Sequence, residues 1–306
     1  MRRRVMVGLL AGMLGAGLGG CSDDADAGDD ADAGDDANTD ASADADGTLE
    51  VDVVGDVTEA VDTEAGGEGG VCDGPFVAAP TFEDPFDPDW EETQTEWRRA
   101  SWMQNGTQMS PERCVTSDEG MLQQTVLAGE PYRGGSMQSR SEFPYGRWTA
   151  RLKPSSVPGV LNSMFTMDWD DLTTPGDDGD GSHEEIDIEF LTYTFGEGAG
   201  QVHFAVHRPG HSNHFVEDVE LDFDPSADFR VWGFDILPDR IEWHVDGRVL
   251  ATFVYDATVS ITGAYELFFN SWTQESWING PPAEDAVYEV DWVRFQPYDA
   301  TCAAGG

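Results

Sequence analysis

The chain has 306 residues, with 60 acidic and 16 basic side chains and a formal net charge of −44. This charge excludes nucleic-acid binding as the main activity, because binding to a phosphate backbone requires a basic face. It also excludes a polybasic membrane anchor. Phe, Tyr and Trp are absent from residues 1–73, so this segment cannot bury enough apolar surface to offset its ordering entropy. We therefore expect a single folded domain over residues 74–306.

The first twenty residues have the pattern of an export signal. Three arginines at positions 2–4 precede an apolar stretch, residues 5–18, that is too short to span a membrane as a helix. A Leu-Gly-Gly-Cys motif then ends at Cys21 and matches the bacterial lipobox, in which the cysteine is acylated. We expect a lipoprotein signal peptide over residues 1–20 and a lipid on Cys21, with an ordinary secretory signal as the alternative.

The position after the lipobox bears on where the protein resides. Cys21 is followed by Ser22 and not by aspartate, a pattern typical of outer-membrane lipoproteins. The predicted localisation is therefore the bacterial cell envelope, with the membrane contacted through the lipid anchor only, or the extracellular space after release. Residues 21–73 are rich in Asp and contain no Lys or Arg, so like-charge repulsion should keep them extended as a tether.

The remainder of the chain alternates apolar and polar residues with a period of two, as β-strands do. Residues 147–153 and 241–245 follow this pattern, and Asp246-Gly247 supplies a two-residue hairpin turn after the second. Residues 287–295 also alternate, with Tyr288, Val290, Trp292 and Arg294 on one face. No convincing amphipathic helix longer than two turns is present. The pattern predicts an antiparallel β-sandwich or barrel.

One strand combines three acids with an apolar face. In residues 183–190, Glu185, Asp187 and Glu189 share one face and the intervening residues point to the core. A solvated acidic face is the simplest interpretation, but three like charges ~6.5 Å apart repel one another. If the side chains of Glu185 and Glu189 approach each other, they would also suit retaining glycoside hydrolysis, which uses two carboxyl groups about 5–5.5 Å apart.

The stretch "EEIDIEF" resembles the E-x-D-x-E motif of glycoside hydrolase family 16, jelly-roll enzymes that cut β-glucans. The resemblance covers most of residues 95–296 and extends, in order, to Asn105-Gly106, the strand from Gly146 to Pro154, "DFRVWGFDILPDRIEWHVDGRVL", "FFNSWTQESW" and "YEVDWVRF". It implies an all-β jelly-roll sandwich, similar to concanavalin A-like lectins and glucanases, with a concave cleft. It also implies that Glu185 is the nucleophile, Asp187 its assisting residue and Glu189 the acid/base.

The same resemblance implies a set of cleft contacts to sugar, for which aromatic faces and amide groups are suited. Trp272 and Trp277 lie in a turn-rich stretch, where we expect them to be exposed. His183 stands where lichenases usually have Trp, Gln138 replaces an expected Glu, and His203 also departs from the family pattern. The substrate-binding residues are predicted to be Asn105, Arg140, Phe165, His183, His203, Asn270, Trp272 and Trp277.

The sequence also offers candidate metal and disulfide sites. His203, His207 and His211 recur every four residues, but the apolar residues between them predict a strand and not the metal-binding face of a helix. The family requires no cofactor, and some relatives hold a structural calcium through an Asp in the last strand, here Asp291. Because jelly-roll termini often lie close together, we expect Cys72 to pair with Cys302 and Cys114 to remain free.

The sequence thus predicts a monomeric, retaining endo-β-glucanase whose partner is a neutral polysaccharide. The absence of an extra residue before the last Glu of the motif favours mixed-linkage β-1,3-1,4-glucan. Two alternatives remain open. One is a hydrolase or transglycosylase acting on xyloglucan or β-1,3-glucan, and the other is a carbohydrate-binding jelly roll that has lost catalysis.

Overall fold

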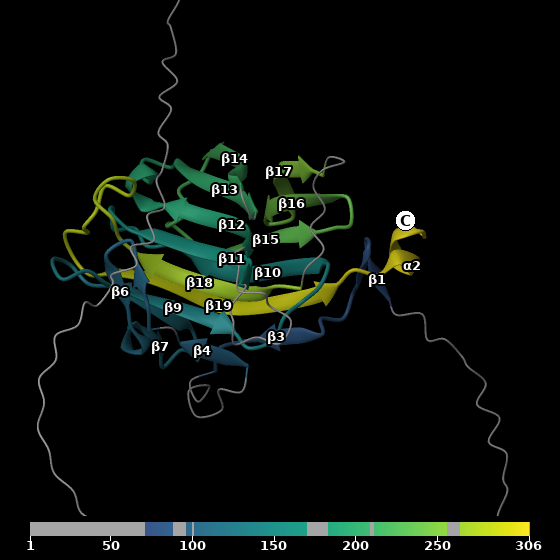
Figure 1. The fold of residues 1–306 in the computed structure, drawn as a ribbon, viewed down its shortest axis with the longest axis horizontal. Helices are drawn as coiled ribbons and strands as arrows, with labels where there is room; N and C mark the ends of the chain where they lie inside the picture. The colour runs from purple at the N-terminus through teal and green to yellow at the C-terminus, as the bar shows by residue number, and fades with distance from the viewer. Residues whose placement is uncertain are drawn as a thin grey trace, which may run out of the picture. The chain divides into compact units, whose positions relative to one another are not determined.

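The computed structural model describes residues 71–87, 96–99, 101–169, 183–208, 211–255 and 264–305. These residues belong to one compact unit that consists of two β-sheets packed against each other (Figure 1). None of the helices in these ranges is both long enough and apolar enough to cross a membrane. The signal peptide, Cys21 and most of the predicted tether lie outside the described residues. The described residues include Cys72 and Asp73, which form the strand β1.

The first sheet is antiparallel, and its longest strand, β19, pairs with three neighbours. In spatial order its strands are β17 (Arg248–Val254), β16 (Arg240–Val245), β15 (Arg230–Ile236), β10 (Gly146–Lys153), β19 (Ala286–Pro297), β8 (Leu122–Val126) and β7 (Cys114–Thr116), with β3 (Phe82–Asp84) also beside β19. A short 3-10 helix, η1 (Pro111–Arg113), precedes β7.

The second sheet contains the acidic strand near its middle. Its order is β14 (His211–Leu221), β13 (Gly200–Arg208), β12 (His183–Leu191), β11 (Leu161–Trp169), β18 (Glu266–Trp272), β9 (Arg133–Ser139), β6 (Thr107–Met109) and β5 (Met103–Gln104), with β4 (Trp97–Arg99) also beside β9. Neighbouring strands are antiparallel except for β6 and β9. The 3-10 helix η2 (Thr192–Thr194) follows β12.

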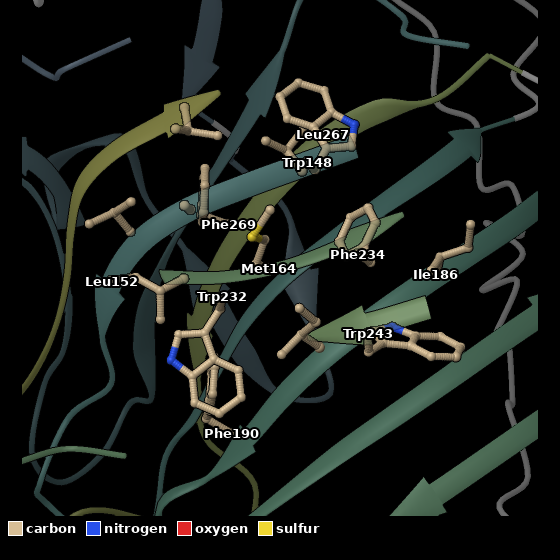
Figure 2. Close-up of a cluster of buried hydrophobic side chains, with 14 of the residues drawn as sticks. Trp148, Leu152, Met164, Ile186, Phe190, Trp232, Phe234, Trp243, Leu267 and Phe269 are labelled. Carbon is tan, nitrogen blue, oxygen red and sulfur yellow. The ribbon is translucent and has the colours of Figure 1, made fainter. Parts of the chain in front are cut away.

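The core lies between the two sheets and is built by the alternating residues that the sequence predicts. The first sheet contributes tryptophans such as Trp148, Trp232 and Trp243, and the second contributes Ile186 and Phe190 (Figure 2). All five side chains are fully buried. Phe190 meets Trp232 edge to face, with ring centroids 4.8 Å apart, a geometry that aromatic rings favour. The inward face of β12 is therefore anchored, which fixes its acidic face outward.

Strand β19 departs from the predicted alternation. The register of β10 against β19 shifts between Arg151, which faces Trp292, and Leu152, which faces Val290, so Asp291 is an extra residue at a bulge. The bulge exchanges the two faces of the strand. Tyr288 and Val290 are buried before it and Val293 after it, whereas strict alternation would have placed Val290 and Val293 on opposite faces. By contrast, Asp246-Gly247 joins β16 to β17 as a two-residue hairpin turn, as predicted.

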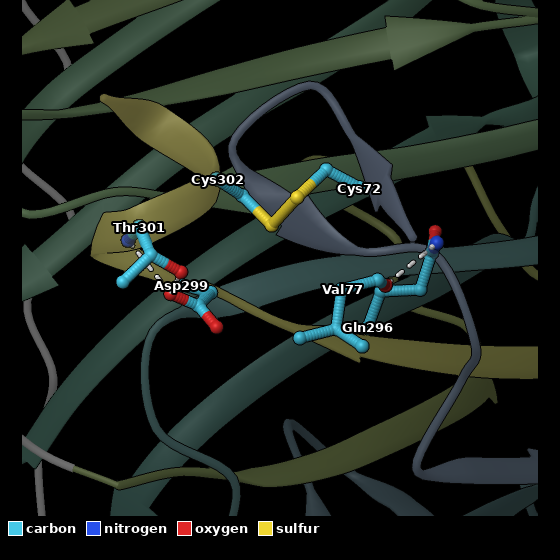
Figure 3. The surroundings of a disulfide bond; sticks show 6 residues. All are labelled: Cys72, Val77, Gln296, Asp299, Thr301 and Cys302. Carbon is cyan, nitrogen blue, oxygen red and sulfur yellow. Dashed lines mark hydrogen bonds between the residues drawn. A yellow bond between two sulfur atoms is a disulfide. The ribbon is translucent and has the colours of Figure 1, made fainter. Parts of the chain in front are cut away.

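The ends of the domain are joined covalently. Strand β1 (Cys72–Asp73) pairs with β2 (Phe76–Val77), and a disulfide joins Cys72 to Cys302 in the short helix α2 (Ala300–Ala303), with 5.5 Å between the two Cα atoms (Figure 3). Gln296 of β19 donates a hydrogen bond to the Val77 carbonyl over 3.2 Å (Figure 3). The third cysteine of the domain, Cys114, is free and buried. Burial raises the pKa of its thiol to about 12.

Candidate active site

The site is built on the outer face of β12. Glu185, Asp187 and Glu189 alternate along this strand with core residues such as Ile186 and Ile188, whose side chains are fully buried. Because successive side chains of a strand point to opposite faces, the three carboxyl groups form one row on the outer face of the second sheet. Asp187, in the middle of the row, is only 3% exposed.

Apolar side chains from neighbouring strands remove water from one side of this row. Met167 and Phe165 of β11 lie opposite Glu185 and Asp187 in the register. Phe165 stacks on Phe268 of β18 with ring centroids 4.8 Å apart, and Trp102 also stacks on Phe268. A carboxylate beside such a surface loses hydration, which favours the protonated form.

The pKa values of two of the three carboxyls reflect this environment. Burial, and after it the negative charge of Glu185, raises the pKa of Asp187 from its usual 3.8 to about 7. Burial also raises the pKa of Glu189 well above its usual range, with the charges of Asp187 and Glu185 acting in the same direction. Both effects favour the protonated form of Glu189, the form that a general acid must hold. A row in which one carboxyl favours its protonated form can supply the two groups that glycosidic bond cleavage uses.

Two histidines from β13 lie beside the row. His203 is opposite Glu189 in the register, and its Nε2 lies 3.7 Å from a Glu189 oxygen while its Nδ1 lies 2.6 Å from Asp218. His207 is opposite Glu185, with its Nε2 3.2 Å from Asp187 Oδ2. Both histidines lie on a strand, as the sequence predicts, and each contacts a different carboxyl.

A divalent cation would find suitable donors in one place on this face. Possible ligand atoms of Glu185, Asp187 and His207 lie within 4.8 Å of one another. Glu185 and Asp187 belong to the carboxyl row and His207 lies beside it, so a cation here would compete with the row for the same oxygens. Asp291, the predicted calcium ligand, forms an ion pair with Arg151 at 2.5 Å, which already neutralises its charge.

Besides His203, the structure places three of the predicted sugar contacts close to the carboxyl row. Phe165 lies opposite Asp187, as described above, and Asn270 of β18 is paired with Ser163, which in turn faces Glu189. Trp277 is 38% exposed and meets His203 edge to face with ring centroids 5.7 Å apart. These residues offer an amide and an aromatic ring beside the predicted acid/base.

The prediction of exposure is wrong for Trp272. This residue ends β18 and is 3% exposed, because it packs with Leu161 and Leu191 under Met109 and Ile278. Leu191 is two residues after Glu189, so the buried cluster lies on the same outer face, one row beyond the acid/base. Trp272 therefore supports that end of the face and does not offer an open ring to sugar.

The remaining predicted contacts have other surroundings. Asn105 is exposed in the turn between β5 and β6, with a positive φ of 45°. Arg140 is exposed, and its Nε donates to the Trp97 carbonyl over 2.9 Å. The side chain of His183 lies outside the described residues. Sequence reasoning missed Glu266, which pairs with Arg98 at 2.7 Å and accepts a hydrogen bond from Gln138. Glu266 meets Gln138 through the pairing of β18 with β9, and Arg98 joins them through the pairing of β4 with β9. The sequence alone gives neither register.

A two-sheet sandwich that carries a row of outward carboxyls on one strand is an arrangement suited to glycoside hydrolysis. Residues 99–294 match the profile of glycosyl hydrolases family 16. The chain belongs to this family, which confirms that it is an enzyme of the glycoside hydrolase class.

Known relatives agree with this assignment. The chain is 28% identical over 231 residues to a beta-glucanase of Bacillus amyloliquefaciens, covering 72% of this chain and 90% of the relative. It is 30% identical over 210 residues to the beta-glucanase of Bacillus subtilis (strain 168), covering 65% and 80%. A solved lichenase from a mouse hindgut metagenome superimposes with a TM-score of 0.58 at 24% identity over 71% of this chain and 98% of that one. This similarity confirms the predicted jelly-roll β-sandwich.

Proposed function

We propose that the chain is a retaining endo-β-glucanase that hydrolyses neutral β-glucans, with mixed-linkage β-1,3-1,4-glucan as its preferred substrate. The observation that carries the proposal is the row of Glu185, Asp187 and Glu189 on β12, in which burial and the neighbouring carboxyls raise the pKa of Glu189 well above its usual range. A retaining glycosidase requires this division of roles, with one carboxyl ready to give a proton and another ready to attack. The family requires no cofactor, and none enters the mechanism.

In the proposed mechanism Glu189 protonates the glycosidic oxygen while Glu185 attacks the anomeric carbon. The leaving chain departs with the proton, and a covalent glycosyl-enzyme remains on Glu185. Glu189, now ionised, removes a proton from water, which attacks the same carbon and releases Glu185. Two inversions give net retention. Asp187, hydrogen-bonded to Glu185, orients the nucleophile and does not bond to the sugar.

Charge and relatives both support a neutral β-glucan as the substrate. Residues 74–306 contain 13 basic and 41 acidic residues, a formal charge of −28. Such a domain repels anionic polymers at low salt. The relatives at 28% and 30% identity are beta-glucanases, and the solved structure is a lichenase that acts on β-1,3-1,4-glucan. The exposed ring of Trp277 provides a face on which a sugar ring can stack.

The test uses the purified full chain on barley mixed-linkage glucan, laminarin, xyloglucan and carrageenan, with Glu185→Gln as the matched control. We expect fastest release of reducing ends from the barley glucan, a rapid fall in viscosity that marks internal cleavage, and a first-formed product of β configuration by NMR. The Glu185→Gln variant should release none. Faster cleavage of laminarin would overturn the substrate assignment, and an α first product would overturn retention.

We also propose that the enzyme is exported and held at the bacterial cell envelope by a lipid on Cys21. The basic, apolar and Leu-Gly-Gly-Cys segments of the sequence support this proposal. When the full chain is expressed in a bacterium supplied with radioactive palmitate, the protein should be labelled and enter the detergent phase. Cys21→Ser should lose the label and move to the aqueous phase. An unlabelled wild-type protein would refute the anchor.

A further inference from the structure

His207 contacts the middle carboxyl of the row and has no part in the mechanism described so far. Its Nε2 lies 3.2 Å from Asp187 Oδ2, and the two side chains are 26% and 4% exposed. The residue of β13 directly opposite Asp187 is Ala205, whose side chain is a methyl group. Ala205 therefore makes no polar contact with Asp187. His207, two residues further along β13, lies diagonally across from Asp187 and makes the polar contact instead.

We propose that His207 is a positioning residue of this active site. Its imidazole donates a hydrogen bond to Asp187 Oδ2. The other Asp187 oxygen then holds the proton that Asp187 shares with Glu185. The inference rests on the proposed roles of Glu185 and Asp187. It concerns how the nucleophile is oriented, and it assigns His207 no contact with the sugar.

The argument follows from what a buried carboxyl needs. Both oxygens of a buried carboxyl require partners, and a protonated carboxyl has one donor to place. His207 Nε2 lies 3.2 Å from Asp187 Oδ2, a buried oxygen that makes no hydrogen bond in the structure, and a Glu185 oxygen lies within 4.8 Å of the Asp187 carboxyl. With the imidazole N–H on Oδ2, that oxygen accepts, so the proton lies on the oxygen that can donate to Glu185. This arrangement gives the Glu185 carboxylate a fixed hydrogen bond and a fixed direction of attack.

The charged groups around His207 define how it acts on Asp187. Glu185 and Glu189 lie on β12, and His203 lies on β13. From other described strands, the titratable side chains that face the row are Asp218 of β14 and Glu266 of β18. Strand β11 contributes only apolar Phe165 and Met167 at the levels of Asp187 and Glu185. The carboxyls oppose ionisation of Asp187, whereas the His207 hydrogen bond and charge favour it.

The test compares the full-length wild type with His207→Gln and His207→Phe. The Gln amide keeps an N–H donor near the Nε2 position but does not titrate, whereas Phe keeps a flat ring without a donor. We expect His207→Phe to lower kcat on mixed-linkage glucan roughly tenfold to a hundredfold, the range for losing a partner that orients a reacting group, with little change in KM. His207→Gln should recover most of this loss.

A pH readout separates positioning from a merely structural role. Because His207 favours the ionised form of Asp187, its removal should raise the upper apparent pKa of the kcat/KM profile, more in His207→Phe than in His207→Gln. The titration of Asp187 is then measured directly by NMR of the chain labelled at the aspartate carboxyl carbon, with the signal assigned by its loss in Asp187→Asn. It should move upward in the same order.

Each outcome decides the proposal. Unchanged kcat in His207→Phe, or a loss that is equal at every pH with an unmoved Asp187 titration, would overturn it. The NMR titration needs no substrate, so it still decides if the wild type cleaves no β-glucan, a result that would overturn the proposed function alone. If His207→Phe fails to fold, the wild type and His207→Gln suffice, because loss of the imidazole charge must itself raise the pKa of Asp187.

Discussion

Replacing Asp187 with Asn should stabilise the folded domain at neutral pH while it removes most of the activity. In the wild type the pKa of this carboxyl rises from 3.8 to about 7 on folding. The folded state therefore binds the proton more tightly than the unfolded state does. The stability from this group is fully present below about pH 4 and is lost as the pH rises through about 7. Since each pKa unit corresponds to about 1.4 kcal/mol, the loss is on the order of 4 kcal/mol.

Asparagine carries no charge at any pH, so the variant lacks this loss. Its free energy of unfolding should match that of the wild type near pH 4 and exceed it by on the order of 4 kcal/mol near pH 8. The charge of Asp187 raises the pKa of Glu189. Removing that charge removes its repulsion of the ionised Glu189, which also stabilises the variant at neutral pH. Activity falls because Asn cannot share a proton with Glu185 as a carboxylic acid does.

The assay is urea unfolding of the full chain, followed by tryptophan fluorescence at pH 4.5, 6 and 7.5. Asp222→Asn is the matched control, because its side chain is 80% exposed and removing its charge should leave the pH dependence unchanged. The reasoning would be refuted if the wild type and Asp187→Asn lost stability in parallel as the pH rises, because Asp187 would then titrate in the folded state as it does in the unfolded chain.

Two further predictions follow from the same site and from the domain ends. With azide, Glu185→Ala should regain turnover of an activated aryl glycoside and give a glycosyl azide of inverted configuration. Glu189→Ala with azide should give a glycosyl azide of retained configuration. Swapped products would reverse the roles assigned to Glu185 and Glu189. Cys302→Ser opens a loop with a sequence separation of 230 residues, so in oxidising urea titrations it should lose about 5 kcal/mol by the chain-entropy relation. Dithiothreitol should bring the wild type to the same value, and equal stability without it would contradict the prediction.

The sequence predicts the acidic strand well because local patterning determines it. Ile186, Ile188 and Phe190 must face a core, so the acidic residues that alternate with them must face outward, whatever the neighbouring strands are. Burial of Trp272 was not predictable in this way, since the side chains that cover it, Met109 and Ile278, come from segments distant in sequence or beyond a turn.

Register and bulges account for the other differences. The contact between His207 and Asp187 depends on how β13 is aligned with β12, and a shift of one residue would turn His207 to the opposite face. The extra residue at Asp291 has no marker in the sequence, because neither glycine nor proline accompanies this bulge. The local sequence predicts which side chains share the apolar face of a strand. Which side chains of different strands are in contact depends on the pairing between the strands.

The covalent link between Cys72 and Cys302 also has a mechanical consequence. A pulling force that reaches the domain through residues before Val71 enters at Cys72 and passes through the disulfide to the segment that follows β19. Strand β19 is hydrogen-bonded to β10, β8 and β3, so the load is shared by many bonds stressed together. Without the disulfide the same force would peel the β1–β2 hairpin away one bond at a time. An enzyme held on a surface while its polymer substrate is dragged by flow would resist unravelling from that end.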